Sequence, residues 1–426
     1  MRATRCVCAA VLAGVFVLGS SSAFAQDTPQ ALRQEIDQLR KDFEALKQQY
    51  GQRLTTLETK LATAEGTPPA APAAVAPAPP PAAPPPPEPA PMTMGSAVSG
   101  SKVFNPDMAV IGDFLGAAGK NTVNPTPALE MHESELSLQA IVDPYARADF
   151  FISFGQEGVN LEEGFITLTE LPGGLLTKVG KMRAAFGKVN TLHNHILTWA
   201  DRPLVTQNLV GGEDGINDAG VSVARLIPNP WIFLEATGQV FNGNSGDLYK
   251  SSKRSDLSYV GHLRGYQDIN ESSNIDLGFS YSQGHNDSVA DMPLDSLKTQ
   301  LYGIDATFRW KPLQRSLYHS FVGRSEWIWS RRDQPNGLQA TSGFYVSGDY
   351  QVGRRWFTGV RFDRSGRATD GTLIDTGGSF AVTYWPSEFS QVRAQYRRTN
   401  YALAESANEL LFQFQFSIGA HGAHPF

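Results

Sequence analysis

The chain has 426 residues, of which 41% are hydrophobic, 10% aromatic and 18% charged, with a net charge of -6. No stretch after residue 25 approaches the ~20 consecutive apolar residues of a membrane-spanning helix, so a helical membrane protein is excluded. The mild negative charge argues against a nucleic-acid partner, because nucleic-acid-binding proteins usually carry a basic patch.

The N-terminus has the pattern of a secretory signal peptide covering residues 1-25. Basic Arg2 and Arg5 precede an apolar run, and Ala23-Phe24-Ala25 supplies a small-residue cleavage site. Both cysteines of the chain, Cys6 and Cys8, lie in this segment. The exported protein is therefore expected to have neither a disulfide nor a catalytic thiol.

Residues 26-66 are predicted to form a coiled-coil oligomerisation segment. Apolar residues recur with alternating spacings of four and three at Leu32, Ile36, Leu39, Phe43, Leu46 and Tyr50. This spacing is typical of a coiled-coil seam. The alternative is a single amphipathic helix on another surface, but a solitary helix of this length is marginal in water. Residues 67-97, rich in proline and alanine, are predicted to be an extended linker.

Residues 98-426 change character and are predicted to form an outer-membrane β-barrel. In the last segment, one face carries Leu410, Phe412, Phe414, Phe416 and Ile418, and the other carries Gln413, Gln415 and Ser417. Such alternation over about ten residues is typical of a membrane barrel strand. Because a soluble β-sandwich alternates as well, the connections must decide between the two.

Short and long connections alternate along this region. Short turns are expected at 143-145, 171-174, 227-230, 267-273, 311-316, 352-355 and 385-388. Longer polar loops are expected at 119-128, 155-160, 184-214, 242-255, 284-297, 332-339, 365-372 and 400-408. Seven turns and eight loops give sixteen strands, an even number with short periplasmic turns and longer external loops. The predicted fold class is an all-β transmembrane antiparallel barrel of about sixteen strands, preceded by an α-helical coiled coil on its linker.

One segment carries a family resemblance. Residues 179-190 (VGKMRAAFGKVN), followed by Asp201-Arg202-Pro203-Leu204 and Asp218-Ala219-Gly220-Val221, resemble the third-loop region of phosphate-selective-type porins. The layout of the chain is also similar to trimeric porins with a periplasmic N-terminal coiled-coil extension. The resemblance implies a homotrimer of barrels, each narrowed by a long loop folded inward.

The candidate site residues fall into two sets. The connection 184-214, the only one expected to be long enough to cross the lumen, would form the constriction with His193, His195, Asp201, Arg202, Glu213 and Asp214. The alternative is an exposed flap. Lumen-facing wall charges are predicted at Lys181, Arg183, Arg309, Arg324, Arg361, Arg393, Arg397, Glu133 and Glu135. These charges either set up a field across the constriction or pair with neighbours, as Arg361 with Asp363 or Arg324 with Glu326.

The predicted function is an outer-membrane porin for passive diffusion of small hydrophilic solutes or ions. Enzyme motifs are absent, and His193-Asn194-His195 falls short of a zinc signature, so neither catalysis, a metal nor a cofactor is expected. The expected partners are outer-membrane lipid, other copies of the chain, and periplasmic or cell-wall components reached by the coiled coil. The alternative is a structural tether between the outer membrane and such periplasmic partners.

Overall fold

The computed structural model describes residues 106–155, 158–286 and 297–419. The chain divides into two compact units, Met1–Ala90 and Pro91–Phe426, and every described residue belongs to the second. The predicted signal peptide, coiled coil and most of the linker fall in the first unit, and all three lie outside the described residues. Within the described ranges, no helix is both long and apolar enough to span a membrane.

Sixteen strands form the described part of the chain. The first eight are β1 (Asp107–Lys120), β2 (Leu129–Asp143), β3 (Ala146–Gly155), β4 (Gly158–Leu171), β5 (Leu175–Arg183), β6 (Asn217–Leu226), β7 (Phe233–Phe241) and β8 (Ser258–Asn270). The other eight are β9 (Ser273–His285), β10 (Lys298–Trp310), β11 (Phe321–Gln334), β12 (Gly337–Gly353), β13 (Trp356–Arg367), β14 (Asp370–Ser387), β15 (Ser390–Asn400) and β16 (Ser406–Gly419). Between β5 and β6 lie η1 (Val189–Thr191), η2 (Asn194–Ile196) and α2 (Leu204–Leu209), and η3 (Ala402–Ala404) precedes β16.

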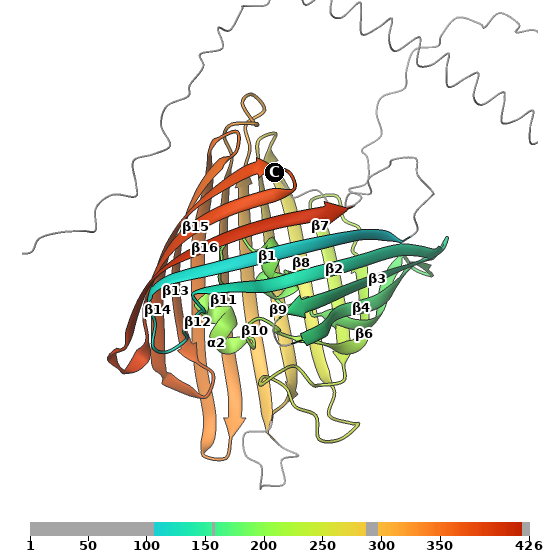
Figure 1. Ribbon diagram of the computed structural model, residues 1–426. Helices are drawn as coiled ribbons and strands as arrows, with labels where there is room; N and C mark the ends of the chain where they lie inside the picture. Colours follow the sequence, from blue (N-terminus) through green and yellow to red (C-terminus); the bar gives the residue numbers. More distant parts are fainter. Residues whose placement is uncertain (1–105, 156–157, 287–296, 420–426) are drawn as a thin grey trace, which may run out of the picture. The chain divides into compact units, whose positions relative to one another are not determined.

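The strands close into a single barrel in chain order (Figure 1). Each strand pairs antiparallel with the next, and β1 pairs with β16, where Phe114 lies opposite Phe414 and Ala109 opposite Gly419. Closure leaves no strand edge with unpaired backbone groups, as the hydrocarbon region of a membrane requires. The prediction of a sixteen-stranded antiparallel barrel is confirmed.

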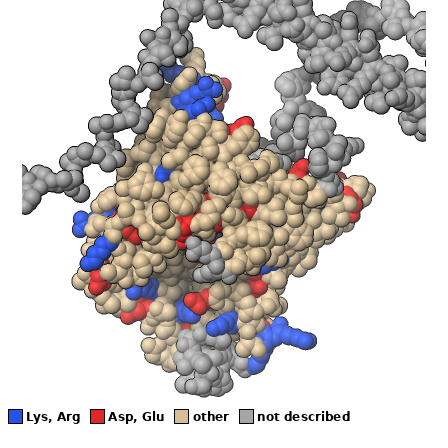
Figure 2. All heavy atoms as spheres, viewed as in Figure 1, with Lys and Arg blue, Asp and Glu red and all other residues tan. Residues whose placement is uncertain are grey.

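Burial along the strands is inverted relative to a soluble protein. On β16, Phe412 is 48% exposed whereas its neighbour Gln413 is only 3% exposed. Phe414 and Ile418 are likewise exposed, and Gln415 is buried. On the face shown in Figure 2, most lysine and arginine atoms lie toward the ends and edges of the barrel. An apolar outer wall around a polar interior is the arrangement of a transmembrane barrel.

Three expected external loops are instead short connections between paired strands. The expectation of long loops at 155-160, 332-339 and 365-372 is wrong. β3 runs to Gly155 and β4 starts at Gly158, β11 runs to Gln334 and β12 starts at Gly337, and β13 runs to Arg367 and β14 starts at Asp370. These segments are polar, and polarity alone suggested loops. Their backbone groups nevertheless continue the ladder, which does not depend on the polarity of the side chains.

The hydrophobic core lies inside the barrel and is built largely by two connections. Residues 184–216, called loop 3 below, contribute Phe186, Val205 and Leu209. Residues 242–257, called loop 4, contribute Leu248 and Tyr249. The inward residues that pack with them include Phe165, Met182, Leu301, Ile328 and Tyr345. The sequence predicted a loop at 242-255 but not that it folds inward, where Tyr249 is fully buried and its hydroxyl lies 2.6 Å from Ser282 Oγ. Loop 3 is therefore not the only connection that folds inward.

Candidate functional site: the lumen and loop 3

The neck of loop 3 is held by Asn190, which the sequence did not single out. Its side-chain amide donates to the carbonyls of Ala184 (2.9 Å) and Ile216 (3.1 Å), and its Oδ1 accepts the N–H of Ile216. Gly215 has a positive φ of 59°, and a Cβ there would lie 2.0 Å from Asn190 Oδ1. Only glycine fits that position without displacing the clamp. Asn190 therefore joins the two ends of the loop.

Beyond the neck, loop 3 is fixed to β9 and β11. Glu326 of β11 accepts the backbone N–H groups of Lys188 (2.6 Å) and Val189 (2.7 Å). The Nζ of Lys188 lies 2.9 Å from Asp276 of β9. The suggested pair Arg324–Glu326 is wrong: Arg324 pairs with Asp349 at 2.6 Å, because Glu326 is engaged by the loop backbone.

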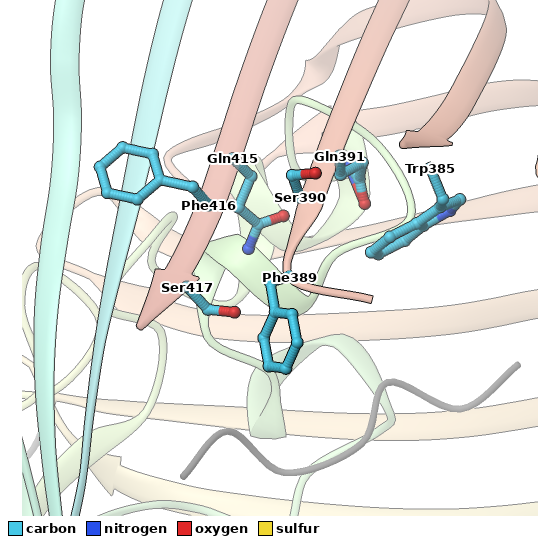
Figure 3. A pocket seen from close by; sticks show the side chains of 7 residues that line it. All are labelled: Trp385, Phe389, Ser390, Gln391, Gln415, Phe416 and Ser417. Carbon is cyan, nitrogen blue, oxygen red and sulfur yellow. The ribbon is translucent and has the colours of Figure 1, made fainter. Parts of the chain in front are cut away.

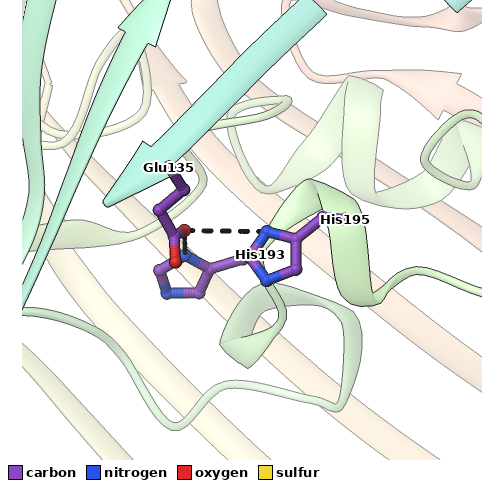
Figure 4. Close-up of side chains that lie close together, drawn as sticks. All are labelled: Glu135, His193 and His195. Atoms are coloured by element: carbon purple, nitrogen blue, oxygen red, sulfur yellow. Dashed lines mark hydrogen bonds and ion pairs between the residues drawn. The ribbon is translucent and has the colours of Figure 1, made fainter. Parts of the chain in front are cut away.

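Farther along, loop 3 meets four acids on β2 and β4, which we call the glutamate cluster: Glu133, Glu135, Glu162 and Glu163. His193 Nδ1 lies 2.6 Å from Glu135 Oε2, and its Nε2 lies 2.7 Å from Glu163 Oε2. Figure 4 shows His193 and His195 both directed at Glu135, the second at 3.6 Å. Burial favours a neutral imidazole, but the hydrogen bonds to Glu135, Glu162 and Glu163 prevail and raise the pKa of His193 to about 11. These hydrogen bonds therefore favour the imidazolium form of His193.

A bulge explains how two consecutive acids reach the same cluster. Strand alternation would send Glu162 and Glu163 to opposite faces. The β3–β4 register shifts between Phe151 and Ile152, so that Glu162 is the extra residue on β4. Both side chains then contact His193, and Glu162 also lies 3.2 Å from Arg183 Nη2.

The far part of loop 3 meets what we call the arginine cluster: Arg361 of β13 and Arg393 and Arg397 of β15. Asp201 Oδ2 lies 2.8 Å from Arg361 and 3.0 Å from Arg397, and its Oδ1 accepts from Gln395. Arg361 also pairs with Asp363 at 2.7 Å, as suggested from the sequence. Although burial would raise it, the pKa of Asp201 is held below its usual range by Arg361 and Arg397.

The remaining predicted loop residues act through backbone groups. Arg202 donates to the carbonyls of Val189 (3.0 Å) and Leu192 (2.7 Å), so it stabilises the loop itself. Burial lowers its pKa to about 10. Glu213 and Asp214 accept from Arg183 Nη1 through their carbonyl oxygens, at 2.8 and 3.1 Å. The carboxylate of Glu213 is free to lie 3.2 Å from His132.

Two of the predicted wall charges stand apart from this pattern. Arg393 donates to Thr383 and Gln413, and within the described ranges it has no carboxylate partner. Lys181 departs from the expectation: it lies opposite outward-facing Gly164, and its Nζ donates to the carbonyl of Leu161. Its neighbour Met182 packs in the hydrophobic core inside the barrel, so strand alternation turns Lys181 away from the lumen. Arg309 is half-buried on β10.

Loop 3 thus touches widely separated parts of the wall. Glu326 lies on β11, whereas Glu135 and Glu163 lie on β2 and β4, seven places around the ring of sixteen strands in either direction. Gln415 of β16 donates to the carbonyl of His195, and Asp375 of β14 accepts from Asn208. The contacts therefore run from one side of the lumen to the other.

A small hollow apart from loop 3 and its two clusters is lined by uncharged side chains. Figure 3 shows its lining near the β14–β15 turn and β16: Trp385, Phe389, Ser390, Gln391, Gln415, Phe416 and Ser417. With no ionisable group, it offers neither acid–base chemistry nor an ion site.

No protein-family profile matches the chain. An "uncharacterized protein" of Aquifex aeolicus (strain VF5) is 29% identical over 340 residues, with a coverage of 71% for each chain. Among solved structures, the anion-selective porin from Comamonas acidovorans has a TM-score of 0.52 at 11% identity, covering 74% of this chain and 99% of that one. OprB of Pseudomonas putida has a TM-score of 0.51 at 11% identity, covering 74% and 94%. OmpT of Vibrio cholerae has a TM-score of 0.50 at 10% identity, covering 74% and 97%.

The chain has the fold of outer-membrane porins. At these identities the likeness is one of fold. The porin fold places polar and charged side chains around an enclosed lumen, which is where loop 3 and both charged clusters lie.

Proposed function

We propose that the protein is an outer-membrane porin through which small hydrophilic solutes or ions diffuse passively, with a pore narrowed by loop 3. The observation that carries the proposal is the path of this loop, which contacts β11 at Glu326 and the β2–β4 wall at His193. A polar lumen behind an apolar outer wall suits the passage of hydrated solutes across a membrane.

The short span between those contacts supports a constriction. Val189 and His193 are four residues apart, and four fully extended residues reach ~14 Å at most. The loop contacts nearly opposite walls within this span, so little free width is left at its level. Charged groups at such a narrowing act on ions more strongly than at an open surface, because less water screens them.

Of the two interpretations of the wall charges, the contacts favour pairing. Arg183, Arg264, Arg324, Arg361, Arg367 and Arg397 each lie within hydrogen-bonding distance of a carboxylate. Paired charges contribute less net field to a passing ion than isolated ones. Arg393 is the arginine best placed to bias ion choice, because it has only neutral hydrogen-bond partners among the described side chains.

Assembly and location follow from the same proposal. We propose a homotrimer in the bacterial outer membrane, with the N-terminal coiled coil in the periplasm. One structure of OmpT from Vibrio cholerae is described as a trimer form, and it covers 74% of this chain with a TM-score of 0.50. A periplasmic tether remains the alternative role for the coiled coil, and it needs no open pore.

Planar-bilayer recording tests the proposal. The full-length protein should give discrete single-channel steps, whereas a tether with a plugged lumen gives no current. Deleting Thr191 to Asp201, which carries both His193 and Asp201, should raise the conductance because the crossing part of loop 3 is gone. Unchanged conductance in a folded deletion variant would show that loop 3 does not limit the pore.

A further inference from the structure

The glutamate cluster brings four carboxyl groups together with few basic side chains beside them. Glu133, Glu135, Glu162 and Glu163 are all at least partly buried on the lumen side. Among the described residues, the basic side chains that touch these carboxylates are Arg183, His193 and His195. Arg202 is close, but its contacts go to backbone carbonyls and to Asn194. Several carboxyl groups buried in one place are costly unless a proton or a cation neutralises them.

Glu133 shows where that cation would sit. Its side chain is 5% exposed, and neither of its carboxylate oxygens has a hydrogen-bond partner in the described part of the chain. Oxygens of Glu133, Glu135 and Glu162 all lie within 4.8 Å of one another. His193 contacts Glu135 and Glu162 through their Oε2 atoms, which leaves the second oxygen of each for another ligand. A buried acid that lacks donors and faces two more acids has the geometry of a cation site.

We propose that Glu133, Glu135 and Glu162 bind a divalent cation on the lumen wall, beside loop 3. Three carboxylates are hard oxygen ligands, which suit Ca²⁺, Mg²⁺ and Mn²⁺ better than soft metals. Bound there, the cation would offset the surplus acids and tie β2 to β4. His193 and His195, directed at Glu135 from loop 3, would then orient one of its ligands from outside.

The test is equilibrium binding of Mn²⁺ to full-length protein in detergent micelles after treatment with EDTA. Free Mn²⁺ gives an electron paramagnetic resonance signal that falls on binding. Added Ca²⁺ that competes for the same site should restore this signal, which measures Ca²⁺ binding. We expect one saturable site per chain. Glu133→Gln removes a ligand charge while keeping the shape of the side chain, and it should weaken Mn²⁺ binding at least 10- to 100-fold, the range roughly seen when even a supporting residue is lost.

Asp305→Asn is the matched control. Asp305 on β10 is also buried, with both carboxylate oxygens unpartnered, but it is not part of the glutamate cluster. This variant should bind Mn²⁺ like the wild type. If Glu133→Gln fails to fold, Glu133→Asp, which keeps the charge but shortens the reach, should still weaken binding.

Three results would overturn the proposal. They are the absence of a saturable site in the wild type, equal loss of binding in Asp305→Asn, and Zn²⁺ binding that depends on His195 but survives Glu133→Gln. The first would indicate that the carboxylates share a proton instead. Because binding is read without any current, the result is independent of whether the barrel conducts.

Discussion

Loop 3 is attached to the barrel wall at two places, His193 and Asp201, by contacts in which the charges are reversed. At the glutamate cluster the loop supplies a cation, His193, to wall acids, whereas at the arginine cluster it supplies an acid, Asp201, to wall arginines. Around Asp201 the ion pairs are complete, since Arg361 and Arg397 share this carboxylate and each has a further acid, Asp363 or Glu409. In the glutamate cluster, Glu133 has no hydrogen-bond partner among the described residues.

The two clusters show that a buried carboxylate can have a structural role in one place, as Asp201 does, and be a candidate metal ligand in another, as Glu133 is. A buried carboxylate with two guanidinium partners closes a network. A buried carboxylate with only other carboxylates around it calls for a proton or a metal ion. The same change, carboxylate to amide, should therefore have opposite consequences at the two clusters.

The largest effect is expected from Asp201→Asn. Removing one partner of a buried ion pair leaves Arg361 and Arg397 short of a counter-charge, which costs roughly 3 kcal/mol. The variant should melt at lower temperature in detergent and show noisier, larger single-channel currents, because this end of loop 3 is released. Asp370→Asn, at the tight turn between β13 and β14, is the control and should match the wild type.

A smaller effect of opposite sign is expected from Glu133→Gln. In EDTA, this change should stabilise the barrel by on the order of 1 kcal/mol, because the amide can donate hydrogen bonds to the neighbouring acids, whereas the Glu133 oxygens have no donor among the described residues. Thermal unfolding in detergent, followed by circular dichroism, measures it. Destabilisation in EDTA equal to that of Asp201→Asn would show that the two clusters do not differ as described.

Ion choice should respond next. Replacing Arg361, Arg393 and Arg397 by alanine should move the zero-current potential in a salt gradient toward cation preference, with a smaller shift at high salt, where screening is stronger. Arg393→Ala alone should give most of the shift without the current noise of a loosened loop, because Arg393 does not contact Asp201 in the described structure. A potential unmoved in both variants would place these side chains off the permeation path.

Acidification should produce the smallest effect. The pKa of Asp201 is held below its ordinary value of 3.8, so the stability it contributes is present above that value and is lost only as the pH falls through the lowered pKa. Between pH 7 and pH 4 this anchor should stay intact. The conductance difference between wild type and Asp201→Asn should therefore persist at pH 4, and its disappearance there would contradict the assignment.

Much of the barrel could be predicted because its signals are local. Alternating runs such as Leu410 to Ile418 and turn residues such as Leu171-Pro172-Gly173-Gly174 fix the strand number without knowledge of tertiary contacts. The expected loops at 155-160, 332-339 and 365-372 were wrong because the hairpin ladders continue through residues with polar side chains. That feature leaves no hydrophobic signal.

The site was less predictable because it depends on register. Glu162 joins the cluster only through a bulge, which a strict period of two cannot represent. The side chain of Asn190 binds the backbone of Ile216, and that of Glu326 binds the backbone of Lys188. No pattern of residue types predicts such contacts between positions far apart in the sequence. His193, His195, Asp201 and Arg202 could be proposed because they share one long connection, although their partners could not.

The pairing of β1 with β16 has a consequence for how the protein folds. Phe114 and Phe414 are neighbours in the ladder although 300 positions separate them. Pairing strands that are so distant in the sequence has the largest loop-closure entropy cost. The β1–β16 ladder should therefore form late, after the local hairpins. Until it forms, β1 and either β15 or β16 have unpaired backbone N–H and C=O groups. These groups are costly in lipid and can pair with the strands of other unfolded chains. A chain shortened before Ser406 would keep those edges permanently and should aggregate instead of inserting.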